Sequence, residues 1–127
     1  MGAMLVRHEP ASAAAVRREL ALDLELLDVP SAAVDNVMLV ASELVGNAVR
    51  HGVHAGDDAT WTVEWTVLGD ELLISVDDPS HDVPVLRHPA PDAPSGRGLA
   101  IVAALSSEWG VEQLSLGKRV WARVRIT

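Results

Sequence analysis

Residues 60–78 read TWTVEWTVLGDELLISVDD, and this stretch decides the fold class. Its first half alternates Trp and Val with Thr and Glu, which is the two-residue period of a strand with one buried face. Gly69 and Asp70 form a two-residue turn, and the second half alternates again. The stretch therefore predicts an antiparallel hairpin that buries one face of a sheet.

Helical periodicity occurs on both sides of this hairpin. Residues 12–27 repeat apolar side chains at helical spacing, and Ser12 is a residue type that caps helices. Residues 31–52 predict a second helix with a long apolar face. We expect a third helix from about residue 96 to about Trp109.

The remaining segments complete an α+β chain. Residues 79–95 contain five prolines and predict a long loop. Residues 111–116 and 119–126 predict a last hairpin with Gly117 and Lys118 in its turn. We expect a single domain with the architecture of a two-layer α/β sandwich, in which helices cover one face of a mixed, mostly antiparallel sheet.

Composition excludes several classes of protein. The 127 residues are 49% hydrophobic and 22% charged, contain no cysteine and carry a formal net charge of −8. An acidic chain is disfavoured as a nucleic-acid binder, and the lack of cysteine excludes disulfides and thiolate metal sites. We find no run of about 20 apolar residues and expect no membrane span. Residues 1–7 lack a signal-peptide pattern, so we expect a cytoplasmic protein and assign them no element.

Three polar side chains share one stripe of the second predicted helix. Glu43, Asn47 and His51 follow one another at intervals of four, beside the apolar Leu44 and Ala48. Residues four apart lie on the same face of a helix. A carboxylate there can act as a general base, and an amide oxygen can bind Mg²⁺. The alternative interpretation is an ordinary solvated helix face.

Asp78 ends the second strand of the hairpin on its apolar face. It has the same parity as Ile74 and Val76, whereas Asp77 has the opposite parity and is expected at the surface. A carboxylate on a buried face needs a hydrogen-bond donor, and the amino group of a nucleotide base would serve. The alternative is an Asp that stabilises the following turn at Pro79.

Gly96, Arg97 and Gly98 open the third predicted helix after the proline-rich loop. A helix N-terminus offers unpaired amides, and glycine lets a phosphate approach them. Two glycines at a helix start are weak evidence, since they also occur where nothing binds. The arginines at 119, 123 and 125 share one strand face, which is either solvated or a docking face.

Taken in order, these motifs resemble the GHKL (Bergerat-fold) ATPases over essentially the whole chain. Residues 43–51 resemble the N-box, residues 76–80 the adenine-binding Asp box and residues 96–99 the second glycine box. Residues 79–95 stand where the family has its ATP lid, and residues 117–121 resemble its final strand. In its small size the chain resembles the anti-sigma-factor serine/threonine kinases (RsbW-like). Its residue usage, with an Asp-Pro-Ser motif, resembles that of their actinobacterial members.

The resemblance implies a role for each matched residue. Glu43 would be the catalytic base that activates a serine hydroxyl or water, and Asn47 would hold Mg²⁺ on the phosphates. Asp78 would accept a hydrogen bond from the adenine amino group. The residues implied in ATP binding are Asn47, His51, Asp78, Gly96, Arg97, Gly98 and Leu99. The implied function is phosphorylation of a STAS-domain anti-anti-sigma protein together with sequestration of a sigma factor, by a homodimer.

Two departures from the family pattern motivate an alternative. No glycine follows Asp78 where the family has Asp-x-Gly-x-Gly, and Arg119 stands where it tends to place a Thr beside the adenine. We expect this Arg to crowd the pocket. The alternative is therefore a catalytically weak or inactive domain that sequesters a partner. A detached histidine-kinase ATPase domain is disfavoured, because residues 12–27 contain no phosphoacceptor His.

Overall fold

A computed structural model describes residues 1–7, 9, 11–51, 60–78, 97–115 and 117–127 of the chain. The predicted lid, residues 79–95, and the loop 52–59 lie outside these ranges. The elements follow in the order β1 (Gly2–Arg7), α1 (Ala11–Leu26), α2 (Ser31–His51), β2 (Thr60–Leu68), β3 (Glu71–Asp78), α3 (Arg97–Leu105), β4 (Glu108–Leu114) and β5 (Gly117–Arg125).

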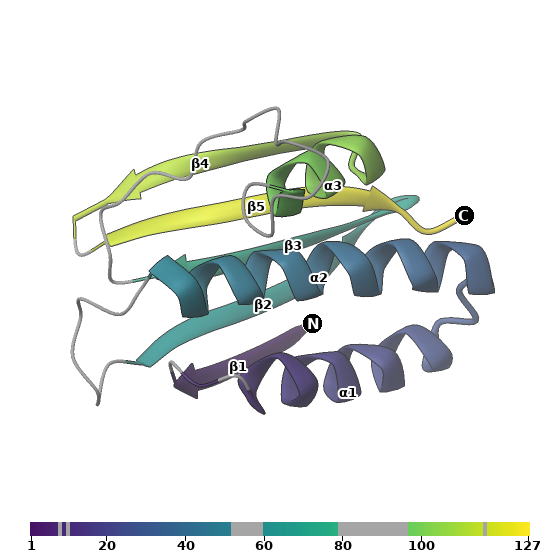
Figure 1. Cartoon of the computed structure of the whole chain (residues 1–127). Helices are drawn as coiled ribbons and strands as arrows, with labels where there is room; N and C mark the ends of the chain where they lie inside the picture. Colours follow the sequence, from purple (N-terminus) through teal and green to yellow (C-terminus); the bar gives the residue numbers. More distant parts are fainter. Residues whose placement is uncertain (8, 10, 52–59, 79–96, 116) are drawn as a thin grey trace.

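The strands form one five-stranded sheet in the order β1-β2-β3-β5-β4. Every neighbouring pair is antiparallel, so the described sheet is antiparallel throughout rather than mixed. The three helices lie on one face of the sheet, with α2 along its middle and packed against β3, β5, α1 and α3 (Figure 1). The predicted α+β two-layer sandwich is confirmed.

The core lies between the helices and the alternating inward side chains of the sheet. Because the chain has no Phe or Tyr, branched aliphatic residues and Trp fill this layer. The hairpin register pairs Val63 with Val76 and Trp65 with Ile74, and all four side chains are buried. The predicted alternation of residues 60–78 is therefore confirmed, and it aligns the apolar face of each strand with its neighbour.

The first strand was missed by the sequence analysis. Residues Gly2–Arg7 form edge strand β1, which pairs with β2 from Gly2–Trp65 to Arg7–Thr60. Only Val6 is fully buried, so the hydrophobic pattern of this strand is weak. An edge strand with one buried position takes its conformation from the partner strand and gives little local signal.

Two other boundaries differ from the prediction. Ser12 lies inside α1 rather than capping it, and its hydroxyl donates to the Arg7 carbonyl at 2.7 Å, which ties the helix to the end of β1. The third helix ends at Leu105 instead of Trp109. The Ser107 amide donates to the Arg123 carbonyl at 2.9 Å, so the chain has already joined the sheet there.

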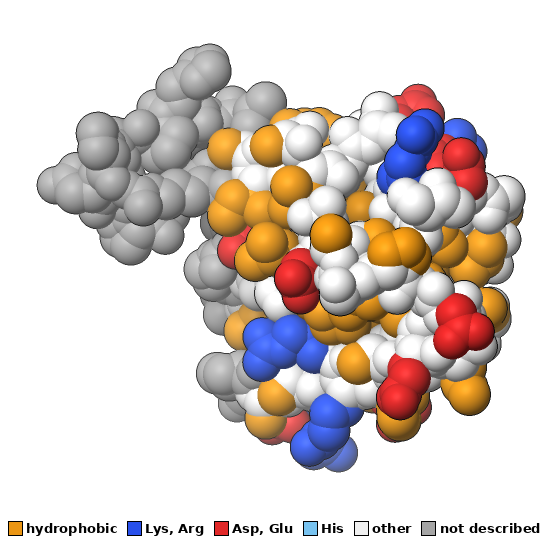
Figure 2. Space-filling view, turned by 90° about the vertical axis from the view of Figure 1, so that its right-hand side faces the viewer, with side chains coloured by type: hydrophobic (Ala, Val, Ile, Leu, Met, Phe, Trp, Pro, Cys, Tyr) orange, Lys and Arg blue, Asp and Glu red, His pale blue; other side chains and the backbone are white. Residues whose placement is uncertain are grey.

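Helix α2 is the central helix of this fold. Its segment Ser31–Val49 has a mean hydropathy of 1.2 and is, by length and composition, long and apolar enough to cross a membrane. The expectation that no stretch of the chain would meet this criterion was therefore wrong. The same apolar face is buried against the sheet and the other helices, as in the core helix of a globular domain. Figure 2 views the side where α2 begins, and hydrophobic side chains there are interspersed with acidic and basic ones.

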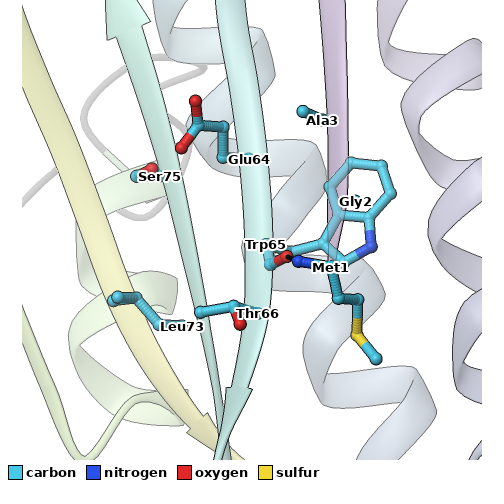
Figure 3. A pocket seen from close by; sticks show the side chains of 8 residues that line it. All are labelled: Met1, Gly2, Ala3, Glu64, Trp65, Thr66, Leu73 and Ser75. Carbon is cyan, nitrogen blue, oxygen red and sulfur yellow. Dashed lines mark hydrogen bonds between the residues drawn. The ribbon is translucent and has the colours of Figure 1, made fainter.

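Trp65 joins β2 to β1 and α1. Its indole packs against Gly2 (Figure 3), where any Cβ would overlap the ring. Its Nε1 donates to the Asp23 carboxylate of α1 at 2.7 Å. A hydrogen bond to a charged acceptor stabilises a fold by about 1.5–3 kcal/mol. The Asp23–Trp65 bond therefore fixes α1 on the sheet.

We expect Asp23→Ala to lower the free energy of unfolding by about 1.5–3 kcal/mol, because it leaves a buried indole N–H without its acceptor. Urea unfolding followed by circular dichroism measures this loss. Glu25→Ala is the matched control, since Glu25 is an exposed carboxylate on the same helix. Equal stabilities of the two variants would show that the Trp65 bond contributes nothing.

Candidate functional site

The sequence motifs converge at one end of the sandwich. The C-terminal half of α2, the end of β3 and the start of β5 lie at the left end of the sheet in Figure 1, and α3 begins nearer its middle. Packing of α2 against β3, β5 and α3 sets this arrangement. The chain thus brings the helix carrying Glu43 and Asn47 over the strand that ends at Asp78.

Two pairs of oppositely charged side chains occupy neighbouring positions where β3 pairs with β5. The register places Asp77 opposite Arg119 and Asp78 opposite Lys118. Consecutive residues of a strand point to opposite faces, so the first pair lies on the open face and the second on the helix-covered face. The two pairs therefore have opposite surroundings although they are adjacent in sequence.

The outer pair is a bidentate surface ion pair. Arg119 Nε and one terminal nitrogen donate to the two Asp77 carboxylate oxygens at 2.6 and 2.9 Å. The hydrogen bond to Asp77 raises the pKa of Arg119, so this cation stays charged at all physiological pH values. Both side chains are about one-third exposed, at 38% and 30%.

The inner pair is buried. The Lys118 ammonium lies 3.7 Å from an Asp78 carboxylate oxygen, and each side chain is 1% exposed. The predicted burial of Asp78 is confirmed. The prediction for Lys118 was wrong, because the register pairs Leu114 with Gly117 and places Lys118 inside β5 instead of in a turn. Gly117 begins this strand with a φ of 140°, a conformation that favours glycine.

The expectation that Arg119 crowds the pocket was also wrong. Its side chain lies on the open face with Asp77 and Glu112, and the cation beside Asp78 is Lys118. Parity could have shown this, since Lys118 alternates with the buried Val120 and Ala122. Arg123 of the same open face pairs with Glu108 at 3.7 Å, so these two arginines lie among carboxylates on a partly solvated face.

A hollow of about 430 Å³ opens at this end of the sheet. Asp78 contributes to its wall, and Trp61 lines it from the start of β2. Trp61 was not among the predicted site residues, although it is a large aromatic buried on the same face of the hairpin as Asp78. The described residues that line it are Thr60, Trp61, Thr62, Asp77, Asp78, Leu114 and Ser115.

Glu43 and Asn47 lie on α2 as the spacing predicts. Asn47 is only 8% exposed and belongs to the buried stripe with Leu44 and Ala48, whereas Glu43 is half-buried. The solvated-face alternative is therefore wrong for Asn47. His51 is the last residue of α2, and its side chain lies outside the described part of the structure.

Of the predicted phosphate-binding residues 96–99, the structure describes the backbone from Arg97 onward. Helix α3 begins at Arg97, so Arg97, Gly98 and Leu99 form its first turn, where backbone N–H groups have no acceptor within the helix. Leu99 is 6% exposed and packs into the protein, so its side chain anchors the turn. Gly96 lies outside the described residues, as do the side chain of Arg97 and the surroundings of Gly98.

A second hollow of about 260 Å³ lies on the open face over β1, β2 and β3 (Figure 3). Ala3, Thr66 and Leu73 line it, with Glu64 as the one charged side chain among its described lining residues. None of its described lining residues belongs to the sequence motifs, whereas Asp78 lines the other hollow, so the hollow at Asp78 is the better candidate site.

Comparison with known proteins agrees with this geometry. The profile of the histidine kinase-like ATPase domain matches residues 6–124. The chain belongs to the histidine kinase-like ATPase family. A search of curated proteins finds no match.

Among solved structures, this ATPase domain is similar to the crystal structure of the RsbU and RsbW domains of Rv1364c from Mycobacterium tuberculosis. The TM-score is 0.74 at 23% sequence identity. The match covers 99% of this chain and 33% of that one. The likeness confirms the GHKL fold, and this chain spans about a third of the matched protein.

The described residues of this ATPase domain fit a magnesium nucleotide. Asp78 offers an acceptor in the hollow, the first turn of α3 offers amides, and Asn47 offers a hard oxygen ligand. The described ranges contain no cluster of three acidic or imidazole side chains for a metal. Mg²⁺ usually keeps several waters and is bound by few protein groups together with substrate phosphates, so a magnesium nucleotide does not need such a cluster.

Proposed function

We propose that this domain binds Mg-ATP in the hollow at Asp78 and transfers the γ-phosphoryl group to a serine of a STAS-domain anti-anti-sigma protein. It would also sequester a sigma factor and work in the cytoplasm as a homodimer. The buried Asp78 carboxylate at the wall of the hollow carries the proposal, because it lies where the family's adenine-binding Asp is expected. Membership of the ATPase family supports nucleotide binding.

Each described residue has a proposed task in the transfer. Glu43 accepts the proton of the serine hydroxyl, whose oxygen forms a bond to the γ-phosphorus as the bond to the bridging oxygen of ADP breaks. Asn47 holds Mg²⁺, which neutralises charge on the phosphates. Phosphoryl transfer needs mainly positioning and charge neutralisation, so this small set of groups is chemically sufficient.

Calorimetric titration of Mg-ATP tests the nucleotide site directly. We expect the wild type to bind and Asp78→Asn to lose at least tenfold in affinity, since a hydrogen bond to a charged group contributes about 1.5–3 kcal/mol. Glu64→Gln is the matched control, because Glu64 is an exposed carboxylate on the open face of the same sheet. Absence of binding to folded wild type would refute the proposal.

A second candidate is a domain that sequesters a partner without kinase activity. The buried Lys118 beside Asp78 favours it, because this ammonium competes for the carboxylate that a base would use. The exposed leucines Leu22 and Leu26 lie one turn apart on α1 and give this helix an apolar surface for a partner or a second copy. Transfer of labelled phosphate to a purified STAS-domain protein would eliminate this candidate.

A further inference from the structure

The Lys118 side chain is unusual because its charge is fully buried. Lysine is almost never fully buried unless its charge is paired. Its partner Asp78 lies at 3.7 Å, a distance that allows charge attraction but is too long for a hydrogen bond. Within the described ranges the ammonium has no hydrogen-bond acceptor. The three N–H donors of Lys118 therefore favour a ligand that brings an acceptor.

Lys118 and Asp78 impose complementary demands on such a ligand. They lie directly opposite one another on β5 and β3, on the helix-covered face, and Asp78 contributes to the wall of the hollow. An ionised carboxylate only accepts hydrogen bonds and an ammonium only donates them. A ligand that contacts both must present a donor and an acceptor on adjacent atoms of one edge.

We propose that Lys118 is a second base-reading residue and that the site takes 6-oxopurine nucleotides, those of guanine or hypoxanthine, at least as tightly as adenine nucleotides. This inference rests on the proposed function, because it requires that a nucleotide base occupies the hollow. It changes the class of nucleotide that the site accepts, and it assigns the discrimination to Lys118.

The hydrogen-bonding edge of a 6-oxopurine fits this pair of charges. Its N1–H donates toward Asp78 while its O6 carbonyl accepts from Lys118, and guanine adds a 2-amino donor beside N1. Adenine offers its amino group as donor but only a ring nitrogen as the neighbouring acceptor. A carbonyl oxygen has two lone pairs for an ammonium, and lysine bound to O6 is a recurring way in which proteins recognise guanine.

Calorimetric titration with Mg-ATP, Mg-GTP and Mg-ITP tests the inference. Inosine triphosphate lacks the 2-amino group, so it isolates the contribution of O6 and N1. We expect wild-type affinities for GTP and ITP to equal or exceed that for ATP. In Lys118→Met the 6-oxopurine affinities should fall at least about tenfold relative to ATP, because one charge-assisted hydrogen bond is lost. Lys118→Gln, which keeps a donor, should recover part of that preference.

The outcomes separate this inference from the proposed function. Wild type that binds ATP more than tenfold tighter than both GTP and ITP would overturn the inference and leave the function intact. An unchanged nucleotide preference in folded Lys118→Met would also overturn it. Folded wild type that binds none of the three nucleotides would overturn both. Because the wild-type ratio is itself decisive, the test stands even if Lys118→Met does not fold.

Discussion

Replacing Asp78 or Lys118 alone is expected to lower the free energy of unfolding by about 3–5 kcal/mol, whereas replacing both is expected to restore most of that loss. Either single change leaves one buried charge without its partner, because both side chains are 1% exposed. The double variant Asp78→Asn/Lys118→Met removes both charges together. Folded domains are stable by only about 5–15 kcal/mol, so each single variant approaches the unfolding threshold.

Urea unfolding of the four proteins gives the coupling energy of the inner pair as a double-mutant cycle. The adjacent outer pair is the matched control, since Asp77 and Arg119 occupy the same two strands but are partly exposed. A cycle with Asp77→Asn and Arg119→Gln should give a coupling energy of at most about 1 kcal/mol. Coupling energies of similar size in the two cycles would contradict the role that we assign to burial.

Replacing Glu43 by Gln is expected to reduce phosphoryl transfer by about 10²–10⁴-fold while Mg-ATP still binds. The amide keeps the size of the side chain but cannot accept the proton of the serine hydroxyl. Since Asp78 and the first turn of α3 are unaffected, nucleotide affinity should change little. Transfer of labelled phosphate to a STAS-domain protein and calorimetry with Mg-ATP measure the two quantities separately.

Asp35→Asn is the control for this experiment, because Asp35 is an exposed carboxylate on the same helix two turns before Glu43. It should leave both transfer and affinity unchanged. Full transfer by Glu43→Gln would remove Glu43 from the mechanism. A parallel loss of transfer and nucleotide binding would show that Glu43 supports the binding site rather than the chemical step.

The burial of a candidate site residue could be predicted from sequence wherever the residue continues the periodic pattern of its own strand or helix. Asp78 is buried because it continues the alternation of Ile74 and Val76, and Asn47 is buried because it lies one turn from Leu44. Both predictions need only the side-chain period of a strand or a helix. Such periods are properties of the backbone, so the sequence is enough to assign a face to a residue.

Lys118 required the tertiary structure. Its parity was readable, but its environment depends on the register of β5 against β3, and the register depends on where the last hairpin turns. A shift of one residue would exchange the faces of Lys118 and Arg119, and with them the buried and the exposed pair. The predicted turn at Gly117 and Lys118 was two residues late, which left Lys118 outside the strand, and the family resemblance placed Arg119 beside the base instead.

Strand β1, at the edge of the sheet, also could not be predicted from sequence, because its pairing with β2 rather than a local pattern defines it. The sequence by itself determined the helices, the central hairpin and the family motifs, since each is encoded within a few consecutive turns or residues. Only the tertiary structure decided which charge accompanies Asp78 and how the edges of the sheet are completed. Those features depend on hydrogen bonds and ion pairs between segments that are far apart in the chain.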